Sequence, residues 1–99
     1  MTTTLNLNTD NFIKYLVSTG ALITDPKGVY YTFKFNNGYG ASVAKHRHSR
    51  GHEKDLWELA ALDYSKEKNG EIAYDHFDGI IGHLTSEAVF VLLETIRNF

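Results

Sequence analysis

The chain of 99 residues contains no cysteine and a single proline. Without cysteine it has no disulfide, no thiolate nucleophile and no cysteine-based zinc site, which is common in reducing compartments. Long apolar runs are also missing, since the longest, Ala88 to Leu93, is far shorter than the ~20 residues that span a bilayer. Met1 to Asn6 has neither the basic start nor the apolar centre of a signal peptide. We therefore expect a cytoplasmic protein with no membrane partner.

The common catalytic motifs are missing as well. No Gly-x-Ser-x-Gly elbow surrounds Ser42, Ser49 or Ser86. The segment Gly38-Tyr39-Gly40 lacks the third glycine and the following helix of a phosphate-binding loop. The sequence therefore predicts a protein that is not an enzyme and that uses no cofactor.

Acidic residues slightly outnumber basic ones, and the two signs are unevenly distributed along the chain. The net charge is −2. Residues 1–52 carry six basic and two acidic side chains, whereas residues 53–99 carry four basic and ten acidic ones. The acidic balance argues against general nucleic-acid binding, which depends on phosphate neutralisation. Apolar residues make up 42% of the chain, enough to pack one domain over residues 1–99.

The clearest structural signal is the alternating segment from Val29 to Phe35, which runs into Asn37-Gly38. Asparagine and glycine both tolerate positive φ, so the pair predicts a two-residue hairpin turn between antiparallel strands. The aromatic face of the first strand is expected to face the core, opposite small residues. The expected cross-strand pairs are Phe35 with Gly40, Phe33 with Ser42 and Tyr31 with Ala44.

Helices are predicted at both ends of the chain. Asn8 or Thr9 is placed to cap a first helix that ends at Gly20. Thr85 is placed to cap a last helix over residues 86–98. The predicted apolar stripes are Phe12, Ile13, Leu16 and Val17 in the first helix, and Val89, Leu92, Leu93 and Ile96 in the last.

The segment from Leu56 to Leu62 is ambiguous between helix and strand. Its leucines, alanines and glutamate favour a helix, but it lies between two turns. We predict a strand buried on both sides, with Trp57, Leu59 and Ala61 toward the core. Glu71 to Tyr74 is predicted as a further strand, followed by a loop from Asp75 to Gly82. The fold class is therefore α+β: an antiparallel meander of about four to five strands, with both helices packed largely on one face.

Three motifs occur in order between about Val29 and the end of the chain. They are Asn37-Gly38-Tyr39-Gly40-Ala41-Ser42-Val43, Leu56-Trp57-Glu58-Leu59-Ala60 and Ile81-Gly82-x-Leu84-Thr85. The combination resembles a family of short proteins from phage and prophage genomes that has no assigned activity or catalytic residues. The resemblance implies a small accessory protein of a mobile element. By analogy it also implies an inhibitor of a host defence nuclease or other host enzyme, of the anti-CRISPR or anti-restriction type.

Histidines are the candidate metal ligands. His46, His48 and His52 lie in one stretch, and His46 and His48 would project from the same face of a strand about 7 Å apart. His76, beside Asp75, could complete such a site. The spacing matches no zinc signature, however, and the neighbouring lysines and arginines would repel a cation. We therefore predict no native metal site.

The same stretch is the only dense basic segment of the chain, and we predict that it forms a charged loop that binds a partner. The acidic loop near Asp75 and Asp78 is expected to assist. The predicted partner is a host protein, and the alternative is a nucleic acid held by segment 45–54. A homodimer is as compatible with the sequence as a monomer. The predicted contact residues are Lys45, His46, Arg47, His48, Arg50, His52, Lys54, Asp75 and Asp78.

Overall fold

The computed structural model describes residues 10–22, 28–45, 54 and 56–99. Along the chain, the described elements are a 3-10 helix, six strands and a C-terminal α-helix. They form one six-stranded antiparallel sheet with the order β1-β2-β3-β4-β5, in which β6 also pairs with β4. The elements are η1 (Asp10–Tyr15), β1 (Leu16–Leu22), β2 (Gly28–Lys34), β3 (Tyr39–Lys45), β4 (Trp57–Asp63), β5 (Glu71–Ile72), β6 (Ile80–Leu84) and α1 (Ser86–Arg97).

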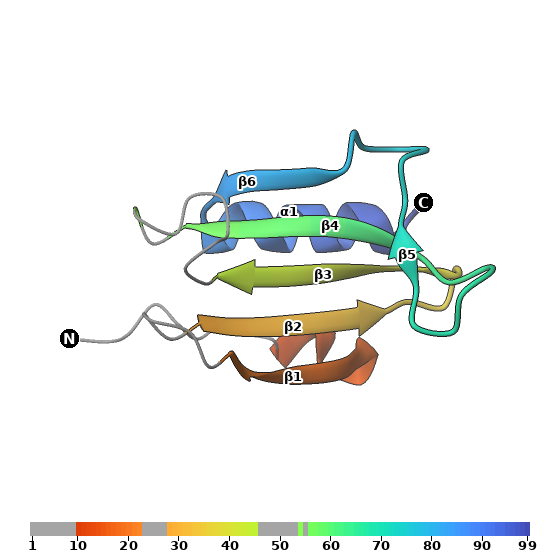
Figure 1. The fold of residues 1–99 in the computed structure, drawn as a ribbon, viewed down its shortest axis with the longest axis horizontal. Helices are drawn as coiled ribbons and strands as arrows, with labels where there is room; N and C mark the ends of the chain where they lie inside the picture. Colours follow the sequence, from red (N-terminus) through yellow and green to blue (C-terminus); the bar gives the residue numbers. More distant parts are fainter. Residues whose placement is uncertain (1–9, 23–27, 46–53, 55) are drawn as a thin grey trace.

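One face of the sheet carries the hydrophobic core. The one α-helix of the described residues packs on β3, β4 and β6, and η1 packs on β2. Figure 1 shows α1 lying behind β4, between β6 and β3, so this view looks onto the opposite face of the sheet. The largest fully buried side chains are Trp57, Phe33, Leu59, Leu93, Ile96, Val43 and Val89. The predicted α+β class with a meander sheet is thus confirmed.

The C-terminal helix follows its predicted local signals. Thr85 is the N-cap, and its hydroxyl accepts a hydrogen bond from the Ala88 amide at 3.2 Å. Val89, Leu93 and Ile96 are fully buried, as expected for the core-facing stripe of an amphipathic helix. The helix itself ends at Arg97, with Asn98 as the C-cap.

The predicted N-terminal helix is wrong. Asp10–Tyr15 forms a 3-10 helix, and the chain then continues as strand β1. Phe12 and Tyr15, three residues apart, are the buried positions, which suits the three-residue repeat of a 3-10 helix. Ile13 and Val17 are each 58% exposed instead of buried. Pairing of β1 with β2 therefore outweighs the helical pattern of the segment.

The hairpin forms, but its register differs from the prediction by one residue. Phe33 lies opposite Ala41 and Tyr31 opposite Val43. The amide of Phe35 donates to the carbonyl oxygen of Tyr39 at 2.7 Å, so the loop has three residues and positive φ occurs at Gly38 alone. Ala41 and Val43 consequently face the core, whereas Gly40, Ser42 and Ala44 face the other side.

The amide side chain of Asn37 has a different role from the one predicted. Its Nδ2 donates to the carbonyl oxygens of Ile96 at 2.9 Å and Arg97 at 3.1 Å, and its Oδ1 accepts from the Tyr39 amide at 3.0 Å. These carbonyls belong to the last turn of α1, which lacks the regular donors four residues further on, and the Ile96 carbonyl also accepts from the Phe99 amide at 3.2 Å. Asn37 therefore ties the hairpin loop to the end of the helix.

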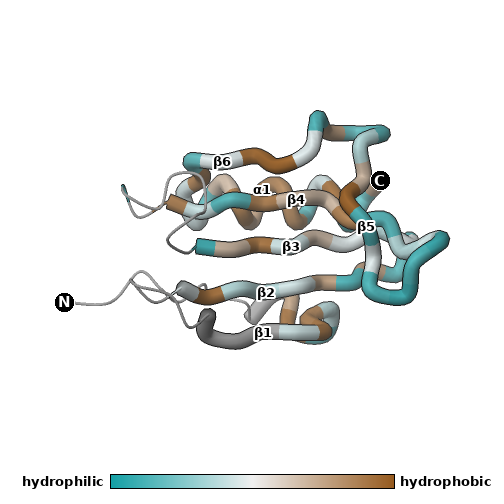
Figure 2. The backbone as a smooth tube through the Cα atoms, in the orientation of Figure 1, coloured by the Kyte–Doolittle hydropathy of each residue, from teal (hydrophilic) through white to brown (hydrophobic). Residues whose placement is uncertain are grey.

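The region after β4 holds one more strand than predicted. Glu71–Ile72 is shorter than the expected strand to Tyr74. The expected loop from Asp75 to Gly82 instead enters strand β6 at Ile80, which pairs with Ala60. The sheet thus has six strands where four to five were expected. Figure 2 shows a hydrophobic stretch within β6, whereas the turn between β4 and β5 is hydrophilic.

Strand β4 confirms the prediction made for the ambiguous segment. Trp57, Leu59 and Ala61 are buried in the core, and Ala60 and Leu62 on the opposite face are buried too. The strand lies between β3 on one side and β5 and β6 on the other, so neighbouring strands cover both of its edges. A buried central strand of this kind tolerates an almost continuous apolar sequence.

Candidate functional site: the uncovered face of the sheet

No helix of the described residues packs on the second face of the sheet, which we call the uncovered face. The registers place Tyr30, Ala44 and Glu58 in one row across β2, β3 and β4. A second row is formed by Thr32, Ser42, Ala60 and Ile80, and a third by Lys34, Gly40, Leu62 and Ile72. The face therefore changes from polar at β2 to apolar at β5 and β6.

The apolar end of this face forms a continuous patch, which we call the apolar patch. Ile80 lies opposite Ala60, and Ile72 lies opposite Leu62, so the four side chains are neighbours on the same face. Ile72 and Ile80 are each 36% exposed, whereas Ala60 and Leu62 are buried beneath them. The members are Ala60, Leu62, Ile72, Tyr74 and Ile80.

Tyr74 joins the apolar patch through Gly79, the residue before β6. A Cβ at Gly79 would lie 3.1 Å from Tyr74 Cε1, so the ring rests against this glycine. Gly79 has a φ of +108°, a conformation that side-chain-bearing residues avoid. The Tyr74 side chain is 68% exposed. A large aromatic group therefore stands at the border of the patch and is open to contact.

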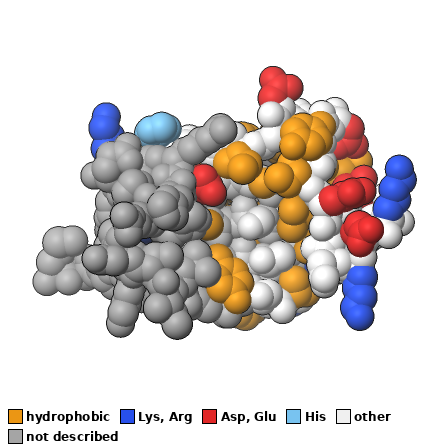
Figure 3. All heavy atoms as spheres, in the orientation of Figure 1, with side chains coloured by type: hydrophobic (Ala, Val, Ile, Leu, Met, Phe, Trp, Pro, Cys, Tyr) orange, Lys and Arg blue, Asp and Glu red, His pale blue; other side chains and the backbone are white. Residues whose placement is uncertain are grey.

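Acidic side chains surround this end of the sheet. Asp63 and Glu71 lie directly opposite each other at the β4–β5 pair, an arrangement of like charges that destabilises a sheet. The Ser65 amide donates to Asp63 Oδ1 at 2.8 Å and lowers the pKa of this carboxyl, which keeps it charged. Figure 3 shows apolar side chains at the end of the face that carries β5 and β6, with acidic side chains beside them and lysine or arginine side chains at the outer edge. We call Asp63, Glu67, Glu71, Asp75 and Asp78 the acidic rim. Alternation along β4 and β5 directs Asp63 and Glu71 to the face that carries α1, so these two border the end of the sheet and not the apolar patch itself.

Asp75, a predicted contact residue, has a structural partner. Its Oδ2 accepts a hydrogen bond of 2.5 Å from the Tyr39 hydroxyl and lies 3.8 Å from His76 Nε2. The His76 ring stacks on Phe99 with a centroid distance of 3.8 Å. Asp75 therefore helps to hold the segment before β6 against β3 and the C-terminal residue. Asp78, the other predicted acidic contact, is exposed.

Lys45 does not lie in an exposed loop, contrary to the prediction. It is the last residue of β3 and its side chain is 3% exposed. Its Nζ lies 4.5 Å from the centroid of the Trp57 ring, so a cation–π contact stabilises it inside the fold. Because the register puts residue 45 on the core face, the alkyl stem is buried with the ring.

Most of the predicted basic loop lies outside the described residues. This applies to His46, Arg47, His48, Arg50 and His52, whose binding role stays a prediction. Lys54 is described and exposed. Within the described ranges, no group of three or more histidine, aspartate or glutamate side chains could hold a metal ion. No helix in the same ranges is long and apolar enough to cross a membrane.

The apolar patch is not among the predicted sites, because Ile80 falls within the loop predicted from Asp75 to Gly82. The signal was the pair Ile80-Ile81 after a glycine, followed by Leu84, which is typical of a short strand. Comparison of the chain with protein-family models, with curated proteins and with solved structures finds no match. A function for the chain is therefore inferred from its surface.

Proposed function

We propose that this chain is a small non-catalytic protein-binding module that holds its partner on the uncovered face of the sheet. The observation that supports this proposal is the apolar patch itself. Exposed isoleucines and a tyrosine sit over a base of buried Ala60 and Leu62, on a face that no helix of the described residues covers. An apolar centre with a charged border is the composition of protein–protein interfaces. Tyr74 is the residue type that most often dominates binding energy there.

The charge at this end of the sheet specifies the partner. The acidic rim places five carboxylates at this end of the molecule, and its members are exposed or half-buried. A complementary surface would present lysines or arginines around an apolar centre. Such charges would raise the association rate and set the orientation, while the apolar contact would supply most of the affinity.

The biological setting follows from the resemblance to short phage and prophage proteins. It supports a role as an accessory protein of a mobile element that inhibits a host enzyme, such as a defence nuclease. In this proposal inhibition is steric: the module occupies a basic surface that the enzyme needs for its own nucleic-acid substrate. An acidic, compact binder suits that surface because it presents negative charge where phosphates would otherwise lie.

Affinity capture from a bacterial lysate tests the proposal when it compares matched variants. Ile72→Glu together with Ile80→Glu should reduce capture of the same host protein by at least about tenfold, because both charges would be buried in the interface. Val91→Glu is the control, since Val91 is 65% exposed on the outer side of α1. Equal capture by all three proteins would contradict the proposal.

Two further variants keep this result interpretable. Tyr74→Ser alters an exposed residue outside regular secondary structure, so it should weaken capture without affecting the fold. Arg47→Glu with Arg50→Glu tests the predicted basic loop in the same assay. Loss of capture only in the arginine variant would assign binding to that loop and remove the apolar patch from the site.

A further inference from the structure

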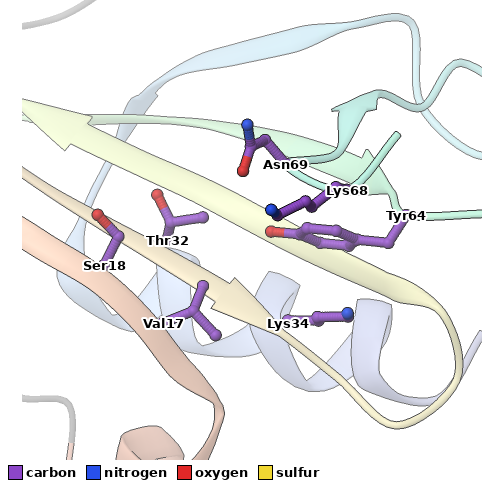
Figure 4. Close-up of a pocket in the computed structure, with 7 residues that line it drawn as sticks. All are labelled: Val17, Ser18, Thr32, Lys34, Tyr64, Lys68 and Asn69. Carbon is purple, nitrogen blue, oxygen red and sulfur yellow. The ribbon is translucent and has the colours of Figure 1, made fainter. Parts of the chain in front are cut away.

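A groove of about 480 Å³ also lies on the uncovered face. It lies toward β1 and β2, whereas the apolar patch lies toward β5 and β6. Its polar lining comes from four separate segments: Ser18 of β1, Thr32 and Lys34 of β2, Tyr64 after β4, and Lys68 and Asn69 of the turn before β5. Val17 adds an apolar wall. Figure 4 shows Tyr64 and Lys68 reaching across the groove toward Thr32 and Ser18 on the neighbouring strands.

The groove is rich in hydrogen-bond donors, and no carboxylate is among the described residues that line it. Two ammonium groups, two aliphatic hydroxyls, one amide and one phenol surround it. Within the described part of the chain, neither Lys34 nor Lys68 is in an ion pair. The Lys34 ammonium lies 5.1 Å from the centroid of the Tyr64 ring. Positive charge therefore gathers in a hollow within a chain whose net charge is −2.

The Tyr64 ring is held in place by two glycines. A Cβ at Gly40 would lie 2.7 Å from Tyr64 Cε2, and one at Gly70 would lie 3.0 Å from Cε1. The two edges of the ring thus rest against backbone that carries no side chain. A wall held in this way needs little ordering when a ligand arrives, which favours affinity.

We infer that this groove binds the phosphate group of a small phosphorylated molecule. Lysine binds phosphate as a point charge, and two lysines match the double charge of a phosphate monoester. The Thr32 hydroxyl and the Asn69 amide are suitable donors for the remaining phosphate oxygens, whereas the Ser18 hydroxyl donates to the Tyr30 hydroxyl at 3.5 Å. The volume lies within the range of small-molecule sites, so it also accommodates the group that carries the phosphate. This inference does not depend on the proposed protein partner.

Titration of the full chain, followed by NMR of its backbone amides, tests the inference. The probes are inorganic phosphate and a nucleoside 5′-monophosphate, with the uncharged nucleoside for comparison. We expect saturable shifts at Thr32, Lys34, Lys68 and Asn69 with both phosphate-bearing probes. Lys34→Gln with Lys68→Gln should weaken binding about tenfold or more, because each substitution removes a charge-assisted hydrogen bond.

Lys66→Gln is the matched control, because Lys66 is exposed in the same turn but does not line the groove. It should leave the affinity unchanged. The inference is overturned if neither phosphate-bearing probe shifts these amides, or if the double variant binds as well as the unmodified chain. A single-stranded oligonucleotide is the last probe. If it alone bound, the ligand would be a nucleic acid and the assignment to a small molecule would be wrong.

Discussion

Gly40 lies directly under the ring of Tyr64. A Cβ at position 40 would come within 2.7 Å of Tyr64 Cε2 and 2.0 Å of the Phe33 carbonyl oxygen. The missing side chain therefore lets an aromatic ring lie across the uncovered face, between the apolar patch and the groove. Burial raises the pKa of the Tyr64 phenol above its ordinary value of 10.0, in agreement with its half-buried position.

Gly40→Ala should destabilise the fold by about 2–3 kcal/mol, because the added methyl group overlaps a backbone oxygen that cannot move freely. Urea unfolding measures the change in free energy of unfolding. The double variant Gly40→Ala with Tyr64→Ala should remain less stable than Tyr64→Ala alone, since the overlap with Phe33 persists. Equal stability of these two proteins would show that β3 shifts to accommodate the added methyl group and would contradict the prediction.

Lys45→Gln should lower the free energy of unfolding by about 1–2 kcal/mol, because a buried cation–π contact with Trp57 is lost. Trp57 is the only tryptophan of the chain, so its fluorescence should also change in the folded state. Lys54→Gln is the control, because Lys54 is exposed. Equal effects of both substitutions would contradict the cation–π contact.

Thr85→Ala should cost about 1 kcal/mol, because the Ala88 amide loses its capping acceptor at the start of α1. Thr85→Ser keeps the hydroxyl and should stay within a few tenths of a kcal/mol of the unmodified chain. Thermal unfolding followed by circular dichroism distinguishes the three proteins. If Thr85→Ser were as unstable as Thr85→Ala, loss of the N-cap hydrogen bond could not explain the lower stability.

The free energy of unfolding should fall at high pH, partly because the Tyr39 phenol loses its proton. The hydrogen bond to Asp75 raises the pKa of Tyr39 above its ordinary value of 10.0, so the folded chain holds the phenolic proton more tightly than the unfolded chain. This contribution is complete below about pH 10 and is lost as the pH rises through the raised value. Urea midpoints measured across this range should therefore decline less steeply in Tyr39→Phe.

Tyr64 provides the internal control for this pH dependence. Burial raises its pKa in the same direction, so part of the decline should persist when Tyr39 is replaced. A decline that is unchanged in Tyr39→Phe would mean that the Tyr39–Asp75 hydrogen bond does not contribute to stability.

Local patterns predicted much of the core correctly. Alternation identified the aromatic face of β2, and the position of Trp57 between leucines identified it as a core residue. The threonine before an amphipathic segment identified the start of α1 within one residue. These predictions succeeded because each depends on neighbours within a few positions of the chain.

The same patterns failed where distant strands compete for a segment. Leu16 and Val17 continue the apolar stripe of the predicted helix, yet Leu16–Leu22 pairs with β2 as an edge strand. Asn37-Gly38 predicted the turn but not its length, because Asn37 also bonds to the last turn of α1, about 60 positions away in the chain. A one-residue change of register exchanges the two faces of a strand, so β3 presents a different set of side chains to the core.

Composition and short-range periodicity predicted an α+β fold with a meander sheet, a buried strand that carries the tryptophan, and a capped C-terminal helix, as the described residues show. The apolar patch and the lysine groove, by contrast, each combine residues from separate strands and turns. Their members become neighbours only when the registers of β1 to β6 are set. Those registers depend on which side chains pack together across the whole sheet, and no short window of sequence contains that information.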